Sequence, residues 1–329
     1  MNCSRIEIAL PSDQNYFPGL LVTVYSMAKN AACDAELSFN ILDGGMDDQS
    51  FSFMESAVVR VHKKSTFRRI KINEQDFSKF PSWKGNRMTY VRYLLPTVLP
   101  DSEFVIYADS DCLWHADIAE IWERRDANVI LQGVHDEWGD ESEQPWFEKR
   151  NLSFPKGRYF CNGLILINLK LFREERIVEQ ATRFIERFPD VQYADQSAFN
   201  YVIGDRVVLL PGRFNVFTRS ISSENVSVGM VLHFANDIPW MYVEEKSYFL
   251  PPYKERWYCE YAEVMQMSVK MACSTFGYKY DSLVNSFWTY VLPRRHLRHL
   301  VFVFMVLIGK RKMLGSLRGM ISQCVTIPS

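Results

Sequence analysis

The chain lacks a large charge imbalance and any paired-cysteine motif. Its 329 residues carry a formal net charge of −1, so it has no global basic field of the kind that nucleic-acid-binding proteins carry. We therefore expect no nucleic-acid partner. The seven cysteines are odd in number and include no C-x-x-C pair. This pattern argues against a disulfide framework or a cysteine-rich zinc site, and it favours free thiols in a reducing compartment.

Targeting segments, repeats and low-complexity stretches are also missing. The first residues show no charged segment followed by a long apolar stretch, so we predict neither a signal peptide nor an N-terminal anchor. What is present is 47% hydrophobic and 14% aromatic residues, enough for a large core. The pattern becomes helical and aromatic after Pro251-Pro252. We therefore expect a catalytic domain over residues 1–250 and a helical, basic extension over residues 251–329.

The C-terminal extension concentrates positive charge. Residues 293–329 hold seven Lys or Arg and no Asp or Glu, which leaves a net charge of −8 on the rest of the chain. The basic clusters flank an apolar run over residues 300–309, which is too short to span a bilayer because that takes roughly 20 residues. A basic, aromatic-bearing segment suits the surface of an anionic membrane. The alternative is a C-terminal helix packed on the domain.

Strand and helix patterns alternate over most of the chain, which predicts an α/β fold with a nucleotide-binding type of sheet. The predicted strands are residues 6–10, 37–42, 67–72, 104–108, 129–134, 160–169, 207–210 and 230–233. The predicted helices are residues 16–29, 50–62, 89–95, 117–122 and 173–188, with another opening at Tyr193. Residues 137–158 form the longest irregular polar segment, and a loop of that length is usually functional.

The strand at residues 104–108 runs directly into Asp109-Ser110-Asp111. Ligands of open α/β sheets collect at the carboxyl ends of strands, and alternate residues of extended chain point to the same side. Two converging carboxylates repel unless a cation lies between them, and a hard divalent ion accepts oxygen ligands while leaving positions open for phosphates. The pattern thus indicates a metal–diphosphate site. The alternative is a solvated turn, because Asp-X-Asp is common in turns.

Seven motifs in order resemble those of the family 8 retaining glycosyltransferases, which include glycogenin and bacterial lipopolysaccharide α-glycosyltransferases. The resemblance covers roughly residues 6–240. Its motifs are Ser12-Asp13-Gln14-Asn15-Tyr16, Thr89-Tyr90-Val91-Arg92, Tyr107-Ala108-Asp109-Ser110-Asp111, the segment beginning Phe160-Cys161-Asn162-Gly163, Asp195-Gln196, Phe214-Asn215, and His233-Phe234 with Pro239-Trp240. It implies a mixed sheet of the nucleotide-diphospho-sugar transferase (GT-A) type, flanked by helices, with a helical C-terminal extension.

The resemblance also implies roles for individual residues. Asp109, Asp111 and His233 would hold Mn²⁺, or Mg²⁺, although Mn²⁺ accepts mixed oxygen and imidazole ligands better. Gln196, Asp195 and Asp136 would form the catalytic sugar pocket. Gln196 is a poor nucleophile, which favours departure and attack on the same face, and the alternative is a covalent intermediate on Asp195. A donor site would be formed by Pro11, Asp13, Asn15, Arg92, Asp109, Ser110, Asn162 and Gly163. Within it, Asp13 and Asn15 would bind uracil and ribose.

Each of these residues also has a structural interpretation. His233 could be a core histidine that bonds a backbone carbonyl, and Asp13 could cap the following helix. Asn162-Gly163 could form a bulge, and Asp195 could be favoured by the dipole at a helix N-terminus. The aromatic residues between Trp138 and Phe147 could pack as a lid or stack on sugar.

One segment departs from the family pattern. Family members place a glycine and a lysine after the metal histidine, whereas this chain has no lysine there and carries Asp237. An acidic group is unfavourable near a diphosphate. We therefore consider Lys156 and Arg158 as substitutes for the missing lysine at the diphosphate.

The resulting hypothesis is a retaining transferase that moves a hexose, glucose or galactose, from a UDP-sugar to a saccharide or glycolipid acceptor. We expect such an enzyme in the cytoplasm, on the inner face of the plasma membrane, making lipopolysaccharide or another surface polysaccharide. The alternatives are a metal-dependent nucleotidyltransferase and a non-catalytic sugar-nucleotide binder.

Overall fold

The computed structural model describes residues 5–82, 85, 87–218, 228–235, 237–241, 250–278 and 280. The described chain divides into two compact units. The first comprises residues up to Phe217 together with 228–235, and it contains every described strand. The second comprises Thr218 and the described residues from Asp237 onward.

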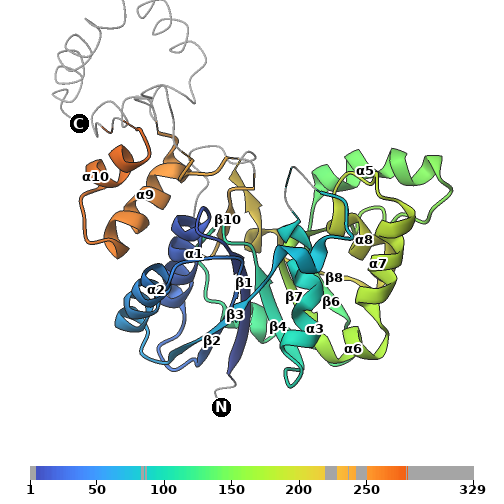
Figure 1. Ribbon diagram of the computed structural model, residues 1–329, viewed down its shortest axis with the longest axis horizontal. Coiled ribbons are helices and arrows are strands. Elements are labelled where there is room, and N and C mark those ends of the chain that lie inside the picture. Colours follow the sequence, from blue (N-terminus) through green and yellow to red (C-terminus); the bar gives the residue numbers. More distant parts are fainter. Residues whose placement is uncertain are drawn as a thin grey trace, which may run out of the picture. The chain divides into compact units, whose positions relative to one another are not determined.

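The first unit is built on a mixed seven-stranded sheet flanked by helices, as the sequence predicts (Figure 1). Its strands, in spatial order, are β3 Ser65–Lys71, β2 Leu37–Asp43, β1 Ile6–Ser12, β4 Phe104–Ala108, β7 Phe160–Asn168, β6 Leu131–His135 and β8 Val208–Leu210. Strand β7 is antiparallel to both of its neighbours, and all other pairs are parallel. The first residues of β7 therefore lie at the same sheet edge as the last residues of β4 and β6.

A three-stranded sheet lies beyond that edge. Its strands are β5 Cys112–Trp114, β10 Val231–His233 and β9 Val216–Phe217, with β10 in the middle. The turn Asp109-Ser110-Asp111 connects β4 of the large sheet to β5 of the small one. This connection brings His233, at the end of β10, opposite Cys112 in the strand register.

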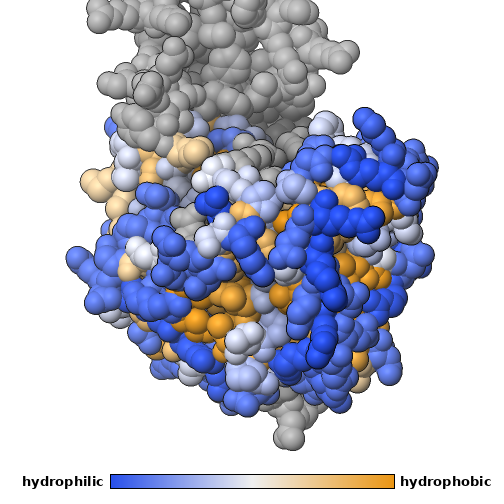
Figure 2. All heavy atoms as spheres, turned by 45° about the vertical axis from the view of Figure 1, so that its right-hand side comes forward, coloured by the Kyte–Doolittle hydropathy of each residue, from blue (hydrophilic) through white to orange (hydrophobic). Residues whose placement is uncertain are grey.

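Most predicted helices are present, and the one predicted over residues 89–95 is a 3₁₀ helix followed by a short α-helix that contains Pro96. In the first unit the helices are α1 Phe17–Asn30, α2 Asp48–Val61, α3 Leu95–Val98, α4 Ala119–Trp122, α5 Glu137–Lys149, α6 Leu169–Glu174, α7 Ile177–Arg187 and α8 Ala194–Ile203. Short 3₁₀ helices are η1 Glu74–Phe77, η2 Met88–Leu94, η3 Gly204–Arg206 and η4 Gly212–Phe214. The core lies between the sheet and these helices, with Val105 and Tyr107 of β4 and Ile165 of β7 fully buried. On the face in Figure 2, hydrophilic residues predominate and hydrophobic ones show between them.

Two segments differ from the sequence prediction. Residues 137–149 form helix α5 instead of an irregular loop. Asp136 caps this helix by accepting from the backbone N–H of Gly139 at 3.0 Å, and Glu143 and Phe147, one turn apart, face inward. The helix predicted over residues 173–188 is interrupted, because Arg176 adopts φ 54 and separates α6 from α7.

The second unit contains α9 Pro252–Val264 and α10 Val269–Thr275. Its aromatic core includes Trp257 and Tyr258, which both contact the ring of Phe276. Among the described residues, no helix is long and apolar enough to cross a membrane. The basic residues and the apolar run of the predicted membrane-associating segment lie outside the described residues. The division into catalytic domain and extension therefore stays a prediction.

Candidate active site

The Asp109-Ser110-Asp111 turn is fastened to strand β1 and helix α1. Ser110 Oγ donates to the carbonyl oxygen of Pro11 at the end of β1. Thr23 Oγ1 contacts the carbonyl oxygens of Ser110 at 3.0 Å and Cys112 at 2.7 Å. All of these groups are in or beside the buried interior. These hydrogen bonds engage backbone carbonyl oxygens and the Ser110 hydroxyl, so the carboxylates of Asp109 and Asp111 are available for other contacts.

Both carboxylates approach His233. Its Nε2 lies 3.1 Å from Asp111 Oδ1 and 3.9 Å from Asp109 Oδ2. Its Nδ1 lies 2.8 Å from Asn215 Oδ1, which fixes the ring and leaves Nε2 directed at the carboxylates. Burial lowers the pKa of His233, but the charge of Asp111 outweighs it and raises the pKa well above the ordinary value. The sequence-predicted metal residues therefore meet at one place.

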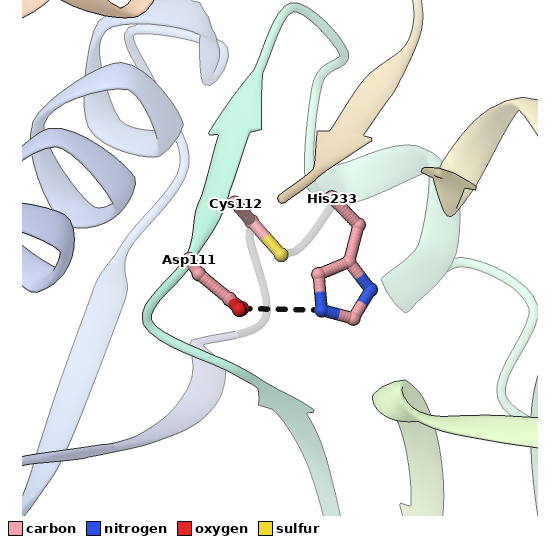
Figure 3. A group of neighbouring side chains, drawn as sticks. All are labelled: Asp111, Cys112 and His233. Carbon is pink, nitrogen blue, oxygen red and sulfur yellow. Dashed lines mark ion pairs between the residues drawn. The ribbon is translucent and has the colours of Figure 1, made fainter. Parts of the chain in front are cut away.

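Cys112 is an addition that the sequence did not suggest. The tightest potential metal-binding group among the described residues is Asp111, Cys112 and His233, whose ligand atoms all lie within 4.8 Å of one another. In Figure 3 the Cys112 sulfur and the Asp111 carboxylate both point toward the imidazole of His233. Burial and the charges of Asp111 and Asp109 raise the pKa of the Cys112 thiol, so the thiol keeps its proton and the carboxylates carry the negative charge.

The chemistry of this group fits a divalent cation. Asp111 Oδ1 is buried, and its contact is the ion pair with His233 Nε2 at 3.1 Å, so two carboxylates share one imidazole. A divalent cation among these side chains would offset both negative charges. Burial and the neighbouring Asp111 raise the pKa of Asp109, against the opposing effects of Arg92 and His233. A Cβ atom on Gly163 would lie 2.3 Å from His233 Cε1 and 3.0 Å from Asp109 Oδ2. Glycine is therefore required where β7 passes the metal residues.

Arg92 joins this cation site to a second group of polar residues. The guanidinium is buried on η2 and contacts Asp109 Oδ1 at 3.2 Å through Nη2. Its Nη1 contacts Asp195 Oδ2 at 2.9 Å. Burial opposes the charge, but Asp195, Tyr107 and Asp109 together raise the pKa of Arg92. The arginine therefore stays ionised and compensates one carboxylate on each side.

Asp195 and Gln196 open helix α8 but point to different partners. The preceding residue, Ala194, has φ 46, a strained value for a residue with a Cβ. Asp195 is 2% exposed and accepts hydrogen bonds from Thr89 Oγ1 and, at 2.9 Å, from Asn162 Nδ2. With Arg92 it has three partners, so its oxygens are fully engaged.

The Gln196 side chain bridges the beginning of β7 and the residue that follows β6. Its Oε1 accepts from the backbone N–H of Asn162 at 3.1 Å, and its Nε2 donates to Asp136 Oδ2 at 3.1 Å. Gln196 is only partly buried. Asp136, Asn162, Asp195 and Gln196 thus form one hydrogen-bonded cluster. We call it the sugar pocket after the role that the resemblance implies for these four residues, and that role stays a prediction.

The residues predicted at the nucleotide end lie at the carboxyl end of β1. Asp13 Oδ1 accepts from the backbone N–H of Tyr16 at 2.9 Å, so Asp13 does fasten the turn before α1, as the structural alternative held. Asn15 is exposed. Tyr16 is a residue the sequence left without a role: burial, Asp111 and Asp109 raise the pKa of its hydroxyl. The end of β1 contacts the acidic turn through Ser110 Oγ, which donates to the carbonyl oxygen of Pro11.

The acidic residue that departs from the family pattern is neutralised within the second unit. Asp237 forms an ion pair with Lys254 Nζ and accepts from the Tyr253 hydroxyl at 2.8 Å. Of the two proposed substitutes for the missing lysine, Arg158 donates from Nη1 to the carbonyl oxygen of Asp205 at 2.8 Å. Lys156 is exposed. Asp237 is therefore compensated locally, and the cation for the diphosphate remains unassigned.

The mixed seven-stranded sheet flanked by helices is a fold of the GT-A type, as in the solved structures of LgtC that it resembles. The family model described as glycosyl transferase family 8 matches residues 7–241. Because that match covers well over half of the chain, the protein belongs to glycosyl transferase family 8.

Individual relatives agree with this placement. A Haemophilus influenzae protein described as a glycosyltransferase is 27% identical over 213 residues, covering 64% of this chain and 63% of its own. The lipopolysaccharide 1,3-galactosyltransferase of Salmonella typhimurium is 23% identical over 223 residues, covering 65% and 64%. The solved galactosyltransferase LgtC, in complex with donor and acceptor sugar analogs, matches 78% of this chain and 96% of its own with a TM-score of 0.65 and 24% identity. This chain thus spans less than two thirds of the two sequence relatives.

Proposed function

We propose that the protein transfers a hexose, glucose or galactose, from a UDP-sugar to a saccharide or glycolipid acceptor, with retention at the anomeric carbon. The observation that carries this is the bridge from the cation site to the sugar pocket: Arg92 contacts Asp109 on one side and Asp195 on the other. In a bound donor, the diphosphate would lie at the cation and the sugar in the pocket. The Arg92 guanidinium would then lie between the two.

Asp109, Asp111 and His233 would hold the cation, which we propose is Mn²⁺ rather than Mg²⁺ because an imidazole is among the ligands. When bound, a divalent ion supplies a Lewis acid that offsets the charge on the departing diphosphate. Arg92 would add a fixed positive charge near the same oxygens. Asp13, Asn15 and Tyr16 surround the edge of β1 where a nucleoside would lie.

Within the sugar pocket, Gln196 is better placed than Asp195 to face the donor. The Asp195 carboxylate is buried and engaged by Arg92, Asn162 and Thr89, so attack by it would require breaking charged hydrogen bonds. An amide is a poor nucleophile. We therefore favour departure of the diphosphate and attack by the acceptor on the same face, with Gln196 and Asp136 orienting the sugar.

An exposed indole and a half-buried phenol lie on the elements that carry Asp136 and Gln196. Trp138 is 59% exposed, and its Nε1 donates to the Tyr193 hydroxyl at 3.1 Å. These residues are in the first turn of α5 and directly before α8. An exposed indole near a hydroxyl suits a sugar ring, which has an apolar face and polar edges. We propose that the acceptor saccharide stacks here.

The test is transfer and Mn²⁺ binding by an Asp111→Asn variant. We expect at least a hundredfold loss of UDP release with UDP-hexose donors, and a weakened Mn²⁺ signal in electron paramagnetic resonance titrations. Asp117→Asn, which alters a carboxylate that accepts from the Ala119 N–H, is the matched control. Turnover within about tenfold of wild type, or roughly 1.4 kcal/mol of barrier, would remove the metal assignment. If the wild-type protein bound UDP-sugars but released no UDP, it would be a non-catalytic binder.

A further inference from the structure

Glu143 is a fully buried carboxyl group that no step above uses. It lies near the middle of α5 and is 0% exposed. Its Oε2 accepts from Ser197 Oγ at 2.6 Å, whereas its Oε1 is buried with no hydrogen bond. A buried carboxyl with one unsatisfied oxygen is unfavourable, so a purely structural role would be filled better by an apolar side chain.

Glu143 ends a chain of hydrogen bonds that begins beside the sugar pocket. Ser197 follows Gln196 on α8 and lies 3.2 Å from the Tyr159 hydroxyl. Ser197 gives its only hydroxyl hydrogen to Glu143, so Tyr159 must donate to Ser197. Burial raises the pKa of Tyr159 well above its ordinary value, which keeps it protonated and able to donate. Each hydroxyl group in this chain therefore donates its hydrogen toward Glu143.

The hydrogen-bond chain also leads to Asp136, whose carboxylate accepts from the side-chain amide of Gln196. Asp136 donates its backbone N–H to the carbonyl oxygen of Tyr159 at 2.8 Å. A Cβ atom on Gly139 would lie 2.5 Å from Tyr159 Cε1, so the first turn of α5 rests directly on the tyrosine ring. Tyr159 thus supports the segment that carries Asp136, and Ser197 is adjacent to Gln196. Glu143 is linked to both sides of the Gln196–Asp136 contact.

We propose that Glu143 is a positioning residue for the sugar pocket, whose ionised form tightens the Gln196–Asp136 contact and whose protonated form loosens it. Charged hydrogen bonds are roughly twice as strong as neutral ones, so ionisation strengthens the Tyr159–Ser197–Glu143 chain. Turnover is then expected to rise as Glu143 loses its proton. This inference rests on the proposed function of Gln196 and Asp136.

The titration of Glu143 falls in an accessible range. Burial raises its pKa to about 7, although hydrogen bonds from Ser197 and from the backbone of Gln192 lower it. Tyr159 is the titratable group that faces it, and it stays protonated. The buried charged groups of α5, its N-cap and α8 are Asp195, which is paired with Arg92, Asp136, and Asp140, which lies 2.9 Å from His135. The other charged residues of α5, Glu137, Glu141, Glu148 and Lys149, are exposed.

The experiment measures kcat and KM for the donor from pH 5.5 to pH 8.5 in the wild type and in Glu143→Gln. The glutamine keeps a neutral acceptor for Ser197, so it imitates the protonated form at every pH. We expect the wild-type kcat to rise about three- to tenfold across pH 7 and the variant to lack this rise, with KM little changed. Glu141→Gln, at an exposed position of the same helix, should keep the wild-type profile. The His135–Asp140 pair is intact in all three proteins and does not account for a difference between them.

Ser197→Ala provides an independent test. It removes the hydroxyl that links Glu143 to Tyr159, so the rise in kcat across pH 7 should be lost, as in Glu143→Gln. Thermal melts give a readout without turnover. Because the folded-state pKa is raised above that of the unfolded chain, wild-type stability should fall between pH 4.5 and pH 7 relative to Glu143→Gln.

Superimposable pH profiles for wild type and Glu143→Gln, in proteins that melt cooperatively, would overturn the proposal. The proposed function fails differently. If Gln196→Ala leaves turnover unchanged at saturating donor, the pocket itself is misassigned. If that variant is impaired while the Glu143 profiles coincide, only the role of Glu143 is wrong.

Discussion

Arg92 contacts Asp195 at 2.9 Å through Nη1 while its Nη2 is 3.2 Å from Asp109. One buried guanidinium therefore compensates a carboxylate of the cation site and a carboxylate of the sugar pocket. The planar fork of arginine allows both contacts at once, and the point charge of a lysine does not. The two halves of the site are thus held in a fixed spacing by a single side chain.

Arg92→Lys should keep the charge and lose one of the two contacts. We expect turnover to fall on the order of a hundredfold, as for a displacement of about 1 Å at reacting groups, with a smaller effect on UDP binding. Arg60→Lys, at an exposed position on α2, is the control. Steady-state kinetics and UDP calorimetry check this. Equal activity of Arg92→Lys and wild type would show that the bridge is not needed.

Gly163→Ala should damage the cation site by steric contact. The added Cβ would lie 2.3 Å from His233 Cε1, closer than any real Cβ contact, so the imidazole must move. We expect a loss of Mn²⁺ affinity of at least about tenfold. Gly212→Ala is a matched control, because a Cβ there meets nothing within 4 Å. The measurement is metal titration followed by paramagnetic resonance, and unchanged affinity would contradict the geometry.

Asp43→Asn should lower stability in a way that depends on pH. The wild-type carboxylate is completely buried and bonds Lys71, Arg69 and the N–H groups of Gly45 and Met46. Burial alone would raise its pKa, but these partners lower it to about 2. The stabilisation is therefore full above pH 4 and is lost as the pH falls through about 2. Urea unfolding should show a deficit of about 1–3 kcal/mol at pH 6 that narrows toward pH 2. A deficit of constant size would mean that packing, not charge, is responsible.

The basic C-terminal segment should control access to a membrane-bound acceptor. Each Lys or Arg near an anionic surface contributes up to about 1 kcal/mol, and the effect is screened by salt. We expect a chain truncated after Tyr290 to release UDP normally from its donor but to act poorly on a glycolipid in vesicles. Full-length protein should pellet with anionic vesicles at low salt and less at high salt. Failure to pellet, or unfolding of the truncated chain, would identify the segment as a packed helix.

The sequence predicted most of the sheet because its strands are short apolar runs between turn residues. Strand β4 and the acidic turn after it were located to the residue. Helix α5 was missed because its outer face is so polar that only Glu143 and Phe147, with two further buried positions, mark the inner side. With a glutamate at an inward-facing position, the segment lacks the apolar periodicity that predicts a helix.

The site was predicted as a set of residues but not as a set of contacts. His233 follows Asp109 and Asp111 by more than a hundred positions in the chain, and the pairing of β10 with β5 brings it to them. The role of Asn215 in orienting His233, and that of Thr89 on Asp195, depend on such long-range pairing. Thr89 and Asn215 belong to motifs of the family resemblance, but no local signal in the sequence gives their partners.

Strand β7 has a consequence for how the protein can vary. All nine of its residues are buried, it pairs on both sides, and its first residues include Asn162 and Gly163. A deletion or insertion of one residue within it would exchange the two faces of the strand, so pocket and core would be lost together. Helix α5 is joined to β7 by residues 150–159, which pair with no strand. Changes of length in residues 150–158 leave the register of β7 intact, so this connection can vary in length where the strand cannot.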